Sequence, residues 1–525
     1  MPLKFVFGPS GSGKSTYLYQ HVIEESEKYP LKNFIVLVPE QFTMQTQKDL
    51  VSMHPRHGIM NIDVLSFARL AYRVFEETGT KQMQVLDDEG KNLILRKIAG
   101  DYENKLTVLK GNIKKLGYIS EVKSVISEFT QYDIGEEEMD EMLDHLDEDS
   151  RLYYKLKDIR LLYEGFQDYL RERYITKEEL LDVLNSQVKE SELLKNSVVV
   201  LDGFTGFTPV QNRLILELMR CCKEVWVTVT MDERENPYTY KHPYQLFGLS
   251  KQMVTTLVRM AGEDHIEVEE PVCLYGYPVK RFEKNQELAF LERNIFRYGS
   301  GRYDKAVENL EIHAAGNPRQ EADAVAEGIR RLVRKEQYRY RDIGVIVSDM
   351  NVYGDYLEQA FENYGIPVFM DHKRSILLNS FVEYIRSLLN MAEKNFSYES
   401  VFRFLRTNLA GFACEEVDEL ENYVLGLGIR GYKGWQNRWI RRLKGMEEEE
   451  LDRLNHYRVQ LVEKVDNLMF VLKQKRKTVR DITMAVYEFM VKENIQERLK
   501  EQKKNFRKQV SWHWRRNIHR STGLS

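Results

Sequence analysis

A glycine-rich stretch close to the start sets the strongest limit on the fold of this chain. Residues 8–15 read Gly-Pro-Ser-Gly-Ser-Gly-Lys-Ser, which fits the phosphate-binding pattern G-x-x-x-x-G-K-[ST]. An apolar run at 3–7 precedes the pattern, and a stretch free of Gly and Pro follows it at 16–27. The pattern therefore lies between an expected strand and an expected helix. This setting favours a phosphate-binding loop over the alternative, a Gly/Ser turn that only caps a helix.

Each residue type in such a loop has a chemical reason. Glycines allow backbone N–H groups to turn inward onto phosphate oxygens, since no Cβ blocks the approach. The ammonium group of Lys14 would reach the β- and γ-phosphates, and the hydroxyl of Ser15 would be a ligand of Mg²⁺. We therefore expect a nucleoside triphosphate and Mg²⁺. The residues expected to hold the nucleotide are Gly8, Pro9, Ser10, Gly11, Ser12, Gly13, Lys14, Ser15 and Thr16.

Two further apolar runs predict the sheet that this loop belongs to. Residues 33–38 and 61–65 read as buried strands, and 66–77 reads as a helix. Strands that alternate with helices indicate a doubly wound α/β core, in which ligands sit beyond the carboxyl ends of the strands. Gln41, Ser66 and Phe67 follow strands at that edge. They are either ligand contacts or simple strand exits and helix caps, and the sequence leaves both open.

A second candidate for the site lies much further along the chain. The run Val-Val-Val-Leu at 198–201 ends in Asp202, as expected of a buried strand that presents a carboxylate to the Mg²⁺ side of a nucleotide. Lys14 and Asp202 are thus the expected catalytic pair. The next residue is Gly203, where many ATPases carry a glutamate that activates water. Because a missing general base costs about 10²–10⁴ in rate, nucleotide binding is better supported than fast turnover.

The rest of the chain divides into helical and α/β stretches. From about 86 to 195 the strand signal disappears, which indicates a helical insertion. A second α/β unit without a phosphate loop follows, with strands expected at 310–314, 342–347 and 367–370. The expected parts are a first lobe at 1–85 and 196–305, a helical insertion at 86–195, a second lobe at 306–378, and a second helical insertion at 379–525.

Composition narrows the class of protein. A formal net charge of -4 argues against a protein that coats nucleic acid through bulk charge. Four cysteines without C-x-x-C spacing predict reduced, mostly buried thiols. The apolar runs are too short to span a membrane, and the start does not resemble a signal peptide. We expect a soluble, cytoplasmic protein without a membrane partner.

Two aromatic and basic stretches remain ambiguous. The tyrosine-rich segment 237–244 could stack bases or pack on its own rings. The basic stretch from 500 onward, with two tryptophans, could contact nucleic acid or be a frayed end.

Several segments together resemble one family, the B subunit of the bacterial AddAB-type ATP-dependent helicase/deoxyribonuclease, the counterpart of RecBCD. Asp-Gly-Phe-Thr-Gly-Phe-Thr-Pro at 202–209 is the most distinctive. The resemblance runs to about residue 500 and implies two RecA-like P-loop lobes of superfamily 1 helicase type, each with a helical insertion. The segments that carry it are 7–15, 38–46, 64–70, 201–211, 317–322, 340–347, 364–376 and 420–435.

The resemblance also implies a function. A member of that family binds ATP, forms a heterodimer with a helicase-nuclease A subunit, engages duplex ends and single-stranded DNA, and recognises a regulatory DNA sequence during recombinational repair of double-strand breaks. Contacts to single-stranded DNA would fall near Gln41, Ser66 and Phe67. Gly203 argues against intrinsic helicase activity.

Full-length members of that family carry more than this chain supplies. They have a C-terminal nuclease domain and a four-cysteine iron–sulfur cluster, and neither is expected in this chain. We expect a fragment or truncated product whose last twenty or so residues depart from the native reading frame. Two other functions stay open: a P-loop phosphotransferase acting on a small molecule, and a non-catalytic scaffold that bound ATP stabilises.

Overall fold

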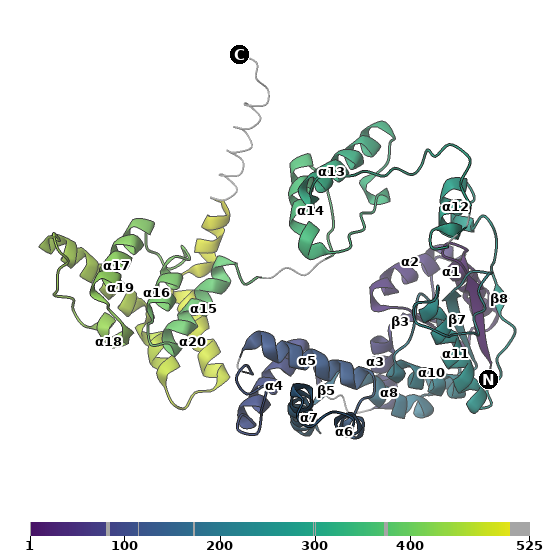
Figure 1. The fold of residues 1–525 in the computed structure, drawn as a ribbon, viewed down its shortest axis with the longest axis horizontal. Coiled ribbons are helices and arrows are strands. Elements are labelled where there is room, and N and C mark those ends of the chain that lie inside the picture. The colour runs from purple at the N-terminus through teal and green to yellow at the C-terminus, as the bar shows by residue number, and fades with distance from the viewer. Residues whose placement is uncertain are drawn as a thin grey trace, which may run out of the picture. The chain divides into compact units, whose positions relative to one another are not determined.

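The structure is a computed structural model that describes residues 2–79, 84–113, 115–171, 174–297, 299, 301–371 and 376–504. It divides into two compact units, Met1–His313 and Ala314–Ser525 (Figure 1).

The first unit is built on a sheet of six parallel strands. Their order across the sheet is β3-β2-β6-β7-β1-β8, and β1 lies between β7 and β8, with Leu3 opposite Val225. The parallel α/β core expected from the apolar runs is therefore confirmed. The strands are β1 (Leu3–Gly8), β2 (Asn33–Leu37), β3 (Ile62–Leu65), β6 (Ser197–Leu201), β7 (Glu224–Thr230) and β8 (Val272–Cys273).

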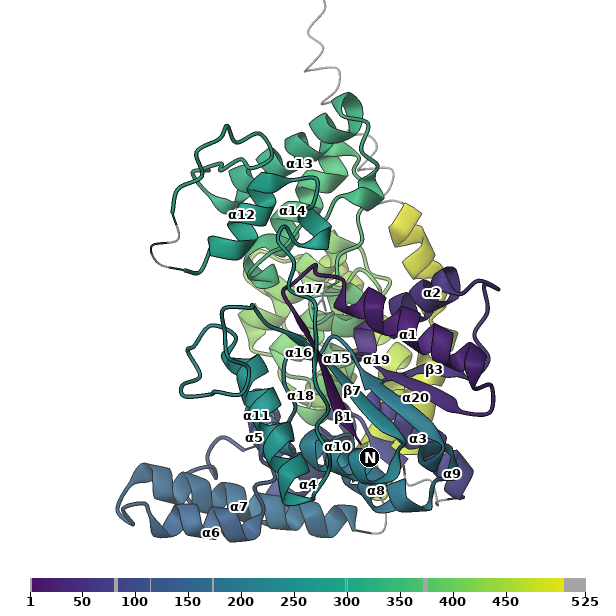
Figure 2. The ribbon, with the colours of Figure 1, turned by 90° about the vertical axis from the view of Figure 1, so that its right-hand side faces the viewer.

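Helices cover both faces of this sheet, because alternate side chains of each strand point to opposite faces. Phe5 and Leu37 lie in one apolar cluster, and their neighbours Val6 and Val36 lie in another. Figure 2 shows α1 and α2 on one side of the strands and α10 and α11 on the other. The helices of the two faces are α1 (Lys14–Lys28) and α2 (Thr43–Met53), opposite α3 (Phe67–Thr78), α8 (Leu180–Gln187), α10 (Pro209–Cys221) and α11 (Gly248–Glu263).

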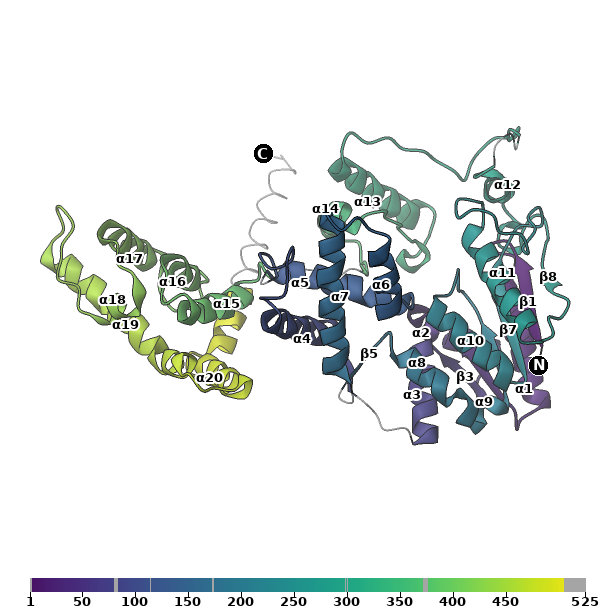
Figure 3. The ribbon, with the colours of Figure 1, turned by 60° about the horizontal axis from the view of Figure 1, so that its bottom comes forward.

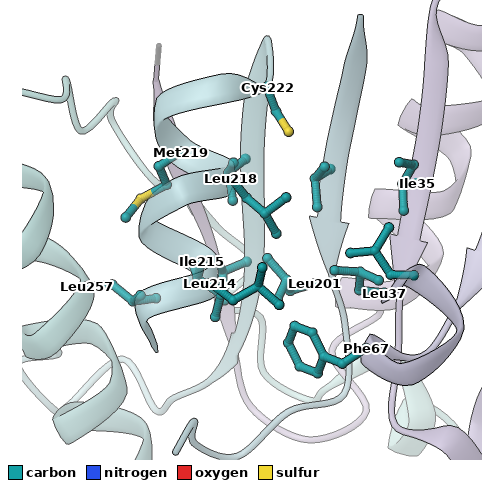
Figure 4. Close-up of a cluster of buried hydrophobic side chains, with 14 of the residues drawn as sticks. Ile35, Leu37, Phe67, Leu201, Leu214, Ile215, Leu218, Met219, Cys222 and Leu257 are labelled. Carbon is teal, nitrogen blue, oxygen red and sulfur yellow. The ribbon is translucent and has the colours of Figure 1, made fainter. Parts of the chain in front are cut away.

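Helix α10 shows how these faces form. Thr208 caps its start by accepting a hydrogen bond from the N–H of Gln211, and Pro209 occupies the first helical position. Its apolar side chains, among them Leu214 and Leu218, point toward Leu201 on the sheet (Figure 4). This packing fixes the carboxyl end of β6, which directly precedes Asp202.

A helical subdomain interrupts the sheet between β3 and β6. It contains α4 (Asp88–Asp101), α5 (Leu116–Gln131), α6 (Glu136–Asp144) and α7 (Arg151–Leu170), which Figure 3 shows as a group. They share a core of their own. The expectation of an all-helical stretch was wrong at one point, because β5 (Tyr174–Thr176) pairs in parallel with β4 (Gln84–Leu86). The shorter elements before β6 are η2 (Val188–Glu190) and α9 (Glu192–Lys195).

The chain returns to the sheet edge after β7. Beyond β8 it forms the short turn η3 (Lys280–Phe282) and helix α12 (Gln286–Asn294). Because β8 pairs with β1, the segment that follows β8 lies close to the loop after β1.

The second unit begins with two packed helices, α13 (Pro318–Lys335) and α14 (Met350–Tyr364), with the turn η4 (Tyr340–Asp342) between them. The strands expected at 310–314, 342–347 and 367–370 were wrong, because none of these described residues belongs to a strand. A strand is stable only when neighbouring strands pair with its N–H and C=O groups. Ile312, Ile346 and Phe369 instead expose most of their side-chain surface.

A helical bundle completes the second unit, with a core that includes Tyr384, Phe404 and Trp435. Its described helices are α15 (Ser380–Glu393), α16 (Tyr398–Leu405), α17 (Cys414–Leu427), α18 (Gly431–Gln436), α19 (Glu448–Lys473) and α20 (Val479–Lys492). The basic stretch expected from 500 onward lies mostly outside the described residues, which end at 504.

The structure bears on two expectations from composition, which concern membrane-spanning helices and the state of the cysteines. Among the described helices, none combines the length and apolar character that crossing a membrane requires. The cysteines are free, but the expectation that most are buried was wrong. Cys222 is buried, Cys221 is half-buried, and Cys273 and Cys414 are exposed.

Candidate nucleotide-binding site

The glycine-rich loop joins β1 to α1 with the backbone that its sequence predicts. Gly11 and Gly13 have φ of 83° and 94°, in the left-handed region that side chains disfavour. The Ser12 N–H donates to the Pro9 carbonyl at 3.2 Å, which tightens the turn. A Cβ on Gly8 would lie 2.4 Å from Ser12 Oγ and 2.9 Å from the Leu274 carbonyl oxygen. The loop thus needs glycine for conformation and for close approach.

Lys14 begins α1 and folds back over the loop. Its Nζ donates to the carbonyl oxygens of Gly8 and Pro9 at 2.8 and 2.9 Å. Burial lowers the pKa of Lys14 from 10.5 to about 8, although the negative charge of Asp202 raises it and the positive charge of Arg281 lowers it further. Lys14 is therefore a desolvated cation held at the loop.

Asp202 follows β6 at the carboxyl end of the sheet, where its N–H donates to the Leu37 carbonyl at 3.0 Å. Its carboxylate is buried and accepts two hydroxyl hydrogen bonds. Tyr19 Oη donates at 2.7 Å and Thr228 Oγ1 at 2.6 Å. Tyr19 lies on α1, the helix that begins with Lys14, so its hydrogen bond links that helix to the carboxyl end of β6.

Gly203, the residue after this aspartate, has a φ of 78°. Its N–H points toward Thr228 Oγ1 at 3.4 Å. An added Cβ would meet only Pro39 Cδ, at 3.7 Å, which is an ordinary contact. Space is therefore available here, but the backbone conformation favours glycine.

Two cations that the sequence analysis missed lie against the loop. Arg281 donates its backbone N–H to the Gly11 carbonyl at 3.0 Å, and its Cβ occupies the space that a side chain on Gly11 would need. The Cδ atom of Lys280 is 3.4 Å from an ideal Cβ on Gly13. Both residues come from η3, far along the chain and in no recognised motif, so only the fold could place them here.

A small pocket opens beside the loop at Pro9. Aromatic rings of Tyr275 and Tyr277 line it together with the side chain of Arg293, whose guanidinium carbon lies 4.4 Å from the centre of the Tyr277 ring. Glu292 also lines it, and burial raises the pKa of that carboxyl group. The site therefore combines a cationic loop with an adjacent pocket lined by both aromatic rings and carboxylates.

The described residues include polar groups suited to a phosphate ligand. Ser12 Oγ is buried and has no hydrogen-bond partner among them. Ser15 and Thr16, at the start of α1, are half-buried and available to a ligand. No cluster of three or more His, Cys, Asp or Glu side chains suited to a metal ion occurs in the described part of the chain. A cation here would need oxygen atoms of the nucleotide as ligands too, as Mg²⁺ commonly does.

The residues expected to contact DNA occupy different environments. Gln41 is exposed in the turn η1 (Glu40–Phe42). Ser66 is buried and caps α3 by accepting from the Arg69 N–H at 3.4 Å. Phe67 is 8% exposed and packs against Phe204, with 5.4 Å between ring centres. Ser66 and Phe67 thus have structural roles, and the DNA contacts of all three stay predictions.

Comparison with known proteins gives a consistent match. The family model described as "ADDB, N-terminal" matches residues 5–292. The chain is 42% identical over 506 residues to the B subunit of an ATP-dependent helicase/deoxyribonuclease from Lachnoclostridium phytofermentans, which covers 95% of this chain and 44% of that protein.

Proteins with the same name match from other bacteria. The one from Caldanaerobacter subterraneus subsp. tengcongensis is 34% identical over 511 residues, which is 95% of this chain and 43% of that protein. The one from Clostridium acetobutylicum is 30% identical over 521 residues, which is 97% of this chain and 44% of that protein. The chain therefore spans less than half the length of these curated relatives.

Proposed function

Because the chain belongs to the family described as "ADDB, N-terminal", we propose that it is the ATP-binding part of the B subunit of a helicase/deoxyribonuclease that processes double-strand breaks for recombinational repair. The observation that carries the nucleotide part of this proposal is the hydrogen bond to the Asp202 carboxylate from Tyr19, which lies on the helix that begins with Lys14. Residues far apart in the sequence would thus supply the phosphate side and the metal side of one site. The relatives' printed name, an ATP-dependent helicase/deoxyribonuclease, supports ATP as the nucleotide.

The loop residues would hold the nucleotide through their chemistry. Backbone N–H groups of the loop and the Lys14 ammonium would bind phosphate oxygens, and the unpartnered Ser12 hydroxyl would gain a hydrogen-bond partner. Ser15 and Asp202 would hold the Mg²⁺ side. When bound, the metal would neutralise phosphate charge. Arg281 and Lys280 add positive charge at the same loop.

Turnover by this site is expected to be slow. Gly203 supplies no general base, and its left-handed backbone disfavours any other residue. This observation favours a second candidate, in which bound ATP stabilises the lobe without being hydrolysed. A measurement of DNA affinity with and without ATP distinguishes the two candidates, because only a DNA-engaging motor subunit should change its affinity for DNA when ATP binds.

The remaining parts of the proposal concern DNA, the second lobe and the partner. Gln41, exposed beside the carboxyl edge of the sheet, is the best candidate for a contact to single-stranded DNA. Residues 306–378 would belong to a second RecA-like lobe. A helicase-nuclease A subunit would complete the heterodimer, and the nuclease and iron–sulfur region would lie outside this chain.

Co-expression with a helicase-nuclease A subunit tests this proposal. The chain should co-purify with that subunit, and the pair should unwind linear duplex DNA in the presence of ATP. The chain alone should bind single-stranded DNA with an affinity that falls steeply with salt, and should not degrade linear DNA. The proposal would be contradicted if no DNA were retained on filters at low salt, or if the purified chain degraded DNA with a metal ion alone.

A further inference from the structure

Two hydroxyl groups hold the Asp202 carboxylate, one on each oxygen. Tyr19 Oη donates to Oδ2 at 2.7 Å, and Thr228 Oγ1 donates to Oδ1 at 2.6 Å. All three side chains are buried. We propose that Tyr19 and Thr228 are positioning residues for the metal side of the nucleotide site, an inference that rests on the proposed ATP–Mg²⁺ binding.

The hydrogen-bonding capacity of a carboxylate explains this arrangement. Its two oxygens offer about four acceptor positions and no donor. Each hydroxyl uses one position on its own oxygen, so each oxygen keeps another for a metal ion or its water shell. Hydrogen bonds to a charged acceptor are short and strong, and two of them from different elements fix the plane of the group. Tyr19 is on α1 and Thr228 is on β7.

The direction of the Tyr19 hydrogen bond follows from the chemistry of its partners. Since the carboxylate can only accept, the Tyr19 proton points to Asp202. Thr46 Oγ1, 3.4 Å from Tyr19 Oη, must then be the donor to the phenol oxygen. A line of hydroxyls thus runs from α2 through Tyr19 to Asp202.

Among the described residues, the phenol hydroxyl is hydrogen-bonded to Asp202 and Thr46. The ring of Tyr19 packs in the apolar cluster with Leu18 and Val36, where a phenylalanine ring would fill the same space. Tyr19 also lies on the helix that begins with Lys14. One helix therefore carries the phosphate-side cation and a group that orients the metal-side carboxylate.

Nucleotide affinity measured with and without metal tests the inference. The dissociation constant of ATPγS is measured in Mg²⁺ and in EDTA for the wild-type chain and its variants. Tyr19→Phe and Thr228→Val should weaken binding in Mg²⁺ by about 10- to 100-fold, as removal of groups that orient metal ligands commonly does. Binding in EDTA should change by less than about twofold, because the phosphate side is unaltered.

Two variants serve as matched controls. Thr228→Ser keeps the hydroxyl and should retain wild-type affinity. Tyr17→Phe removes a phenol from the same helix, and no hydrogen bond of the Tyr17 side chain is found among the described residues, so it should also behave as wild type. If Tyr19→Phe fails to fold, the Thr228→Val and Thr228→Ser pair provides the same comparison.

The possible outcomes separate this inference from the proposed function. Equal weakening in Mg²⁺ and in EDTA would mean that the hydroxyls have only a structural role, and would overturn the inference. Unchanged affinity of both hydroxyl-deleted variants, or a wild-type affinity that does not depend on Mg²⁺, would overturn it as well. A wild-type chain that binds no ATPγS, or a Lys14→Ala variant that binds it equally well, would refute the proposed nucleotide site itself.

Discussion

Replacing Gly203 should destabilise the protein through its backbone alone. Its φ of 78° lies in the left-handed region, where a side chain costs about 1–2 kcal/mol. The nearest atom to an added Cβ is Pro39 Cδ at 3.7 Å, so no steric clash adds to this cost. We therefore expect Gly203→Ala and Gly203→Glu each to lower the free energy of unfolding by about 1–2 kcal/mol.

Gly206 provides a matched control on the same loop. It does not share the left-handed backbone, and an added Cβ there would meet nothing within 4 Å. Gly206→Ala should therefore be neutral or stabilise by about 0.4–1 kcal/mol. Urea titrations of the nucleotide-free protein, followed by circular dichroism, measure both substitutions. A Gly203→Ala variant as stable as wild type, or a Gly206→Ala variant that loses as much stability, would refute the backbone argument.

The same conformation bears on catalysis. A glutamate at position 203 would either adopt the left-handed backbone, at a cost in free energy, or shift the loop and move its carboxylate away from the water molecule. We expect the rate of ATP hydrolysis by Gly203→Glu to stay close to that of Gly203→Ala. A Gly203→Glu variant that hydrolyses ATP much faster without losing stability would show that glycine is not required here.

The burial and exposure of single side chains lead to four further predictions. Burial lowers the pKa of Lys14 from 10.5 to about 8, so between pH 8 and 10.5 the unfolded chain binds more protons than the folded one. The free energy of unfolding of the nucleotide-free protein should therefore rise across that window by about 3 kcal/mol. Urea titrations at several pH values measure this rise, which Lys14→Met should lack. Phe67→Ala should lower the free energy of unfolding by about 3–5 kcal/mol because the ring is buried. Gln41→Ala should change it by less than about 0.5 kcal/mol but should weaken retention of single-stranded DNA on filters. Unchanged retention would show that Gln41 does not contact the DNA. Aspartate at the exposed positions Ile346 and Phe369 should reduce binding of the dye ANS without lowering the melting temperature, and a lower melting temperature would mean that these side chains pack in the fold.

The parts of the site that could be predicted from the sequence share one property. The loop at 8–15, and Asp202 at the end of its strand, are local patterns that follow buried runs, and parallel strands place their carboxyl ends at one edge. The position of each could therefore be inferred without knowing the order of the strands.

The parts that could not be predicted depend on packing between distant segments. Arg281 contacts Gly11 because β8, which precedes Arg281 in the chain, pairs with β1, which precedes the loop. In the sequence, nothing distinguishes Tyr19 from other tyrosines on helices. Its role becomes visible only in the fold, where Asp202 follows β6 and accepts the hydrogen bond of its hydroxyl. Strand propensity at 342–347 and 367–370 was misleading for the opposite reason, since no strand of the described residues pairs with these segments.

Equilibrium dialysis of ATPγS with Mg²⁺ against the wild-type chain and Lys14→Ala shows whether the loop at 8–15 binds a nucleoside triphosphate. We expect one saturable site per chain in the wild type, and an affinity at least about 100-fold lower in the variant, because a buried charged contact to phosphate is lost. A wild-type chain without saturable binding, or a Lys14→Ala variant with undiminished affinity, would contradict the assignment of this loop as a nucleotide site.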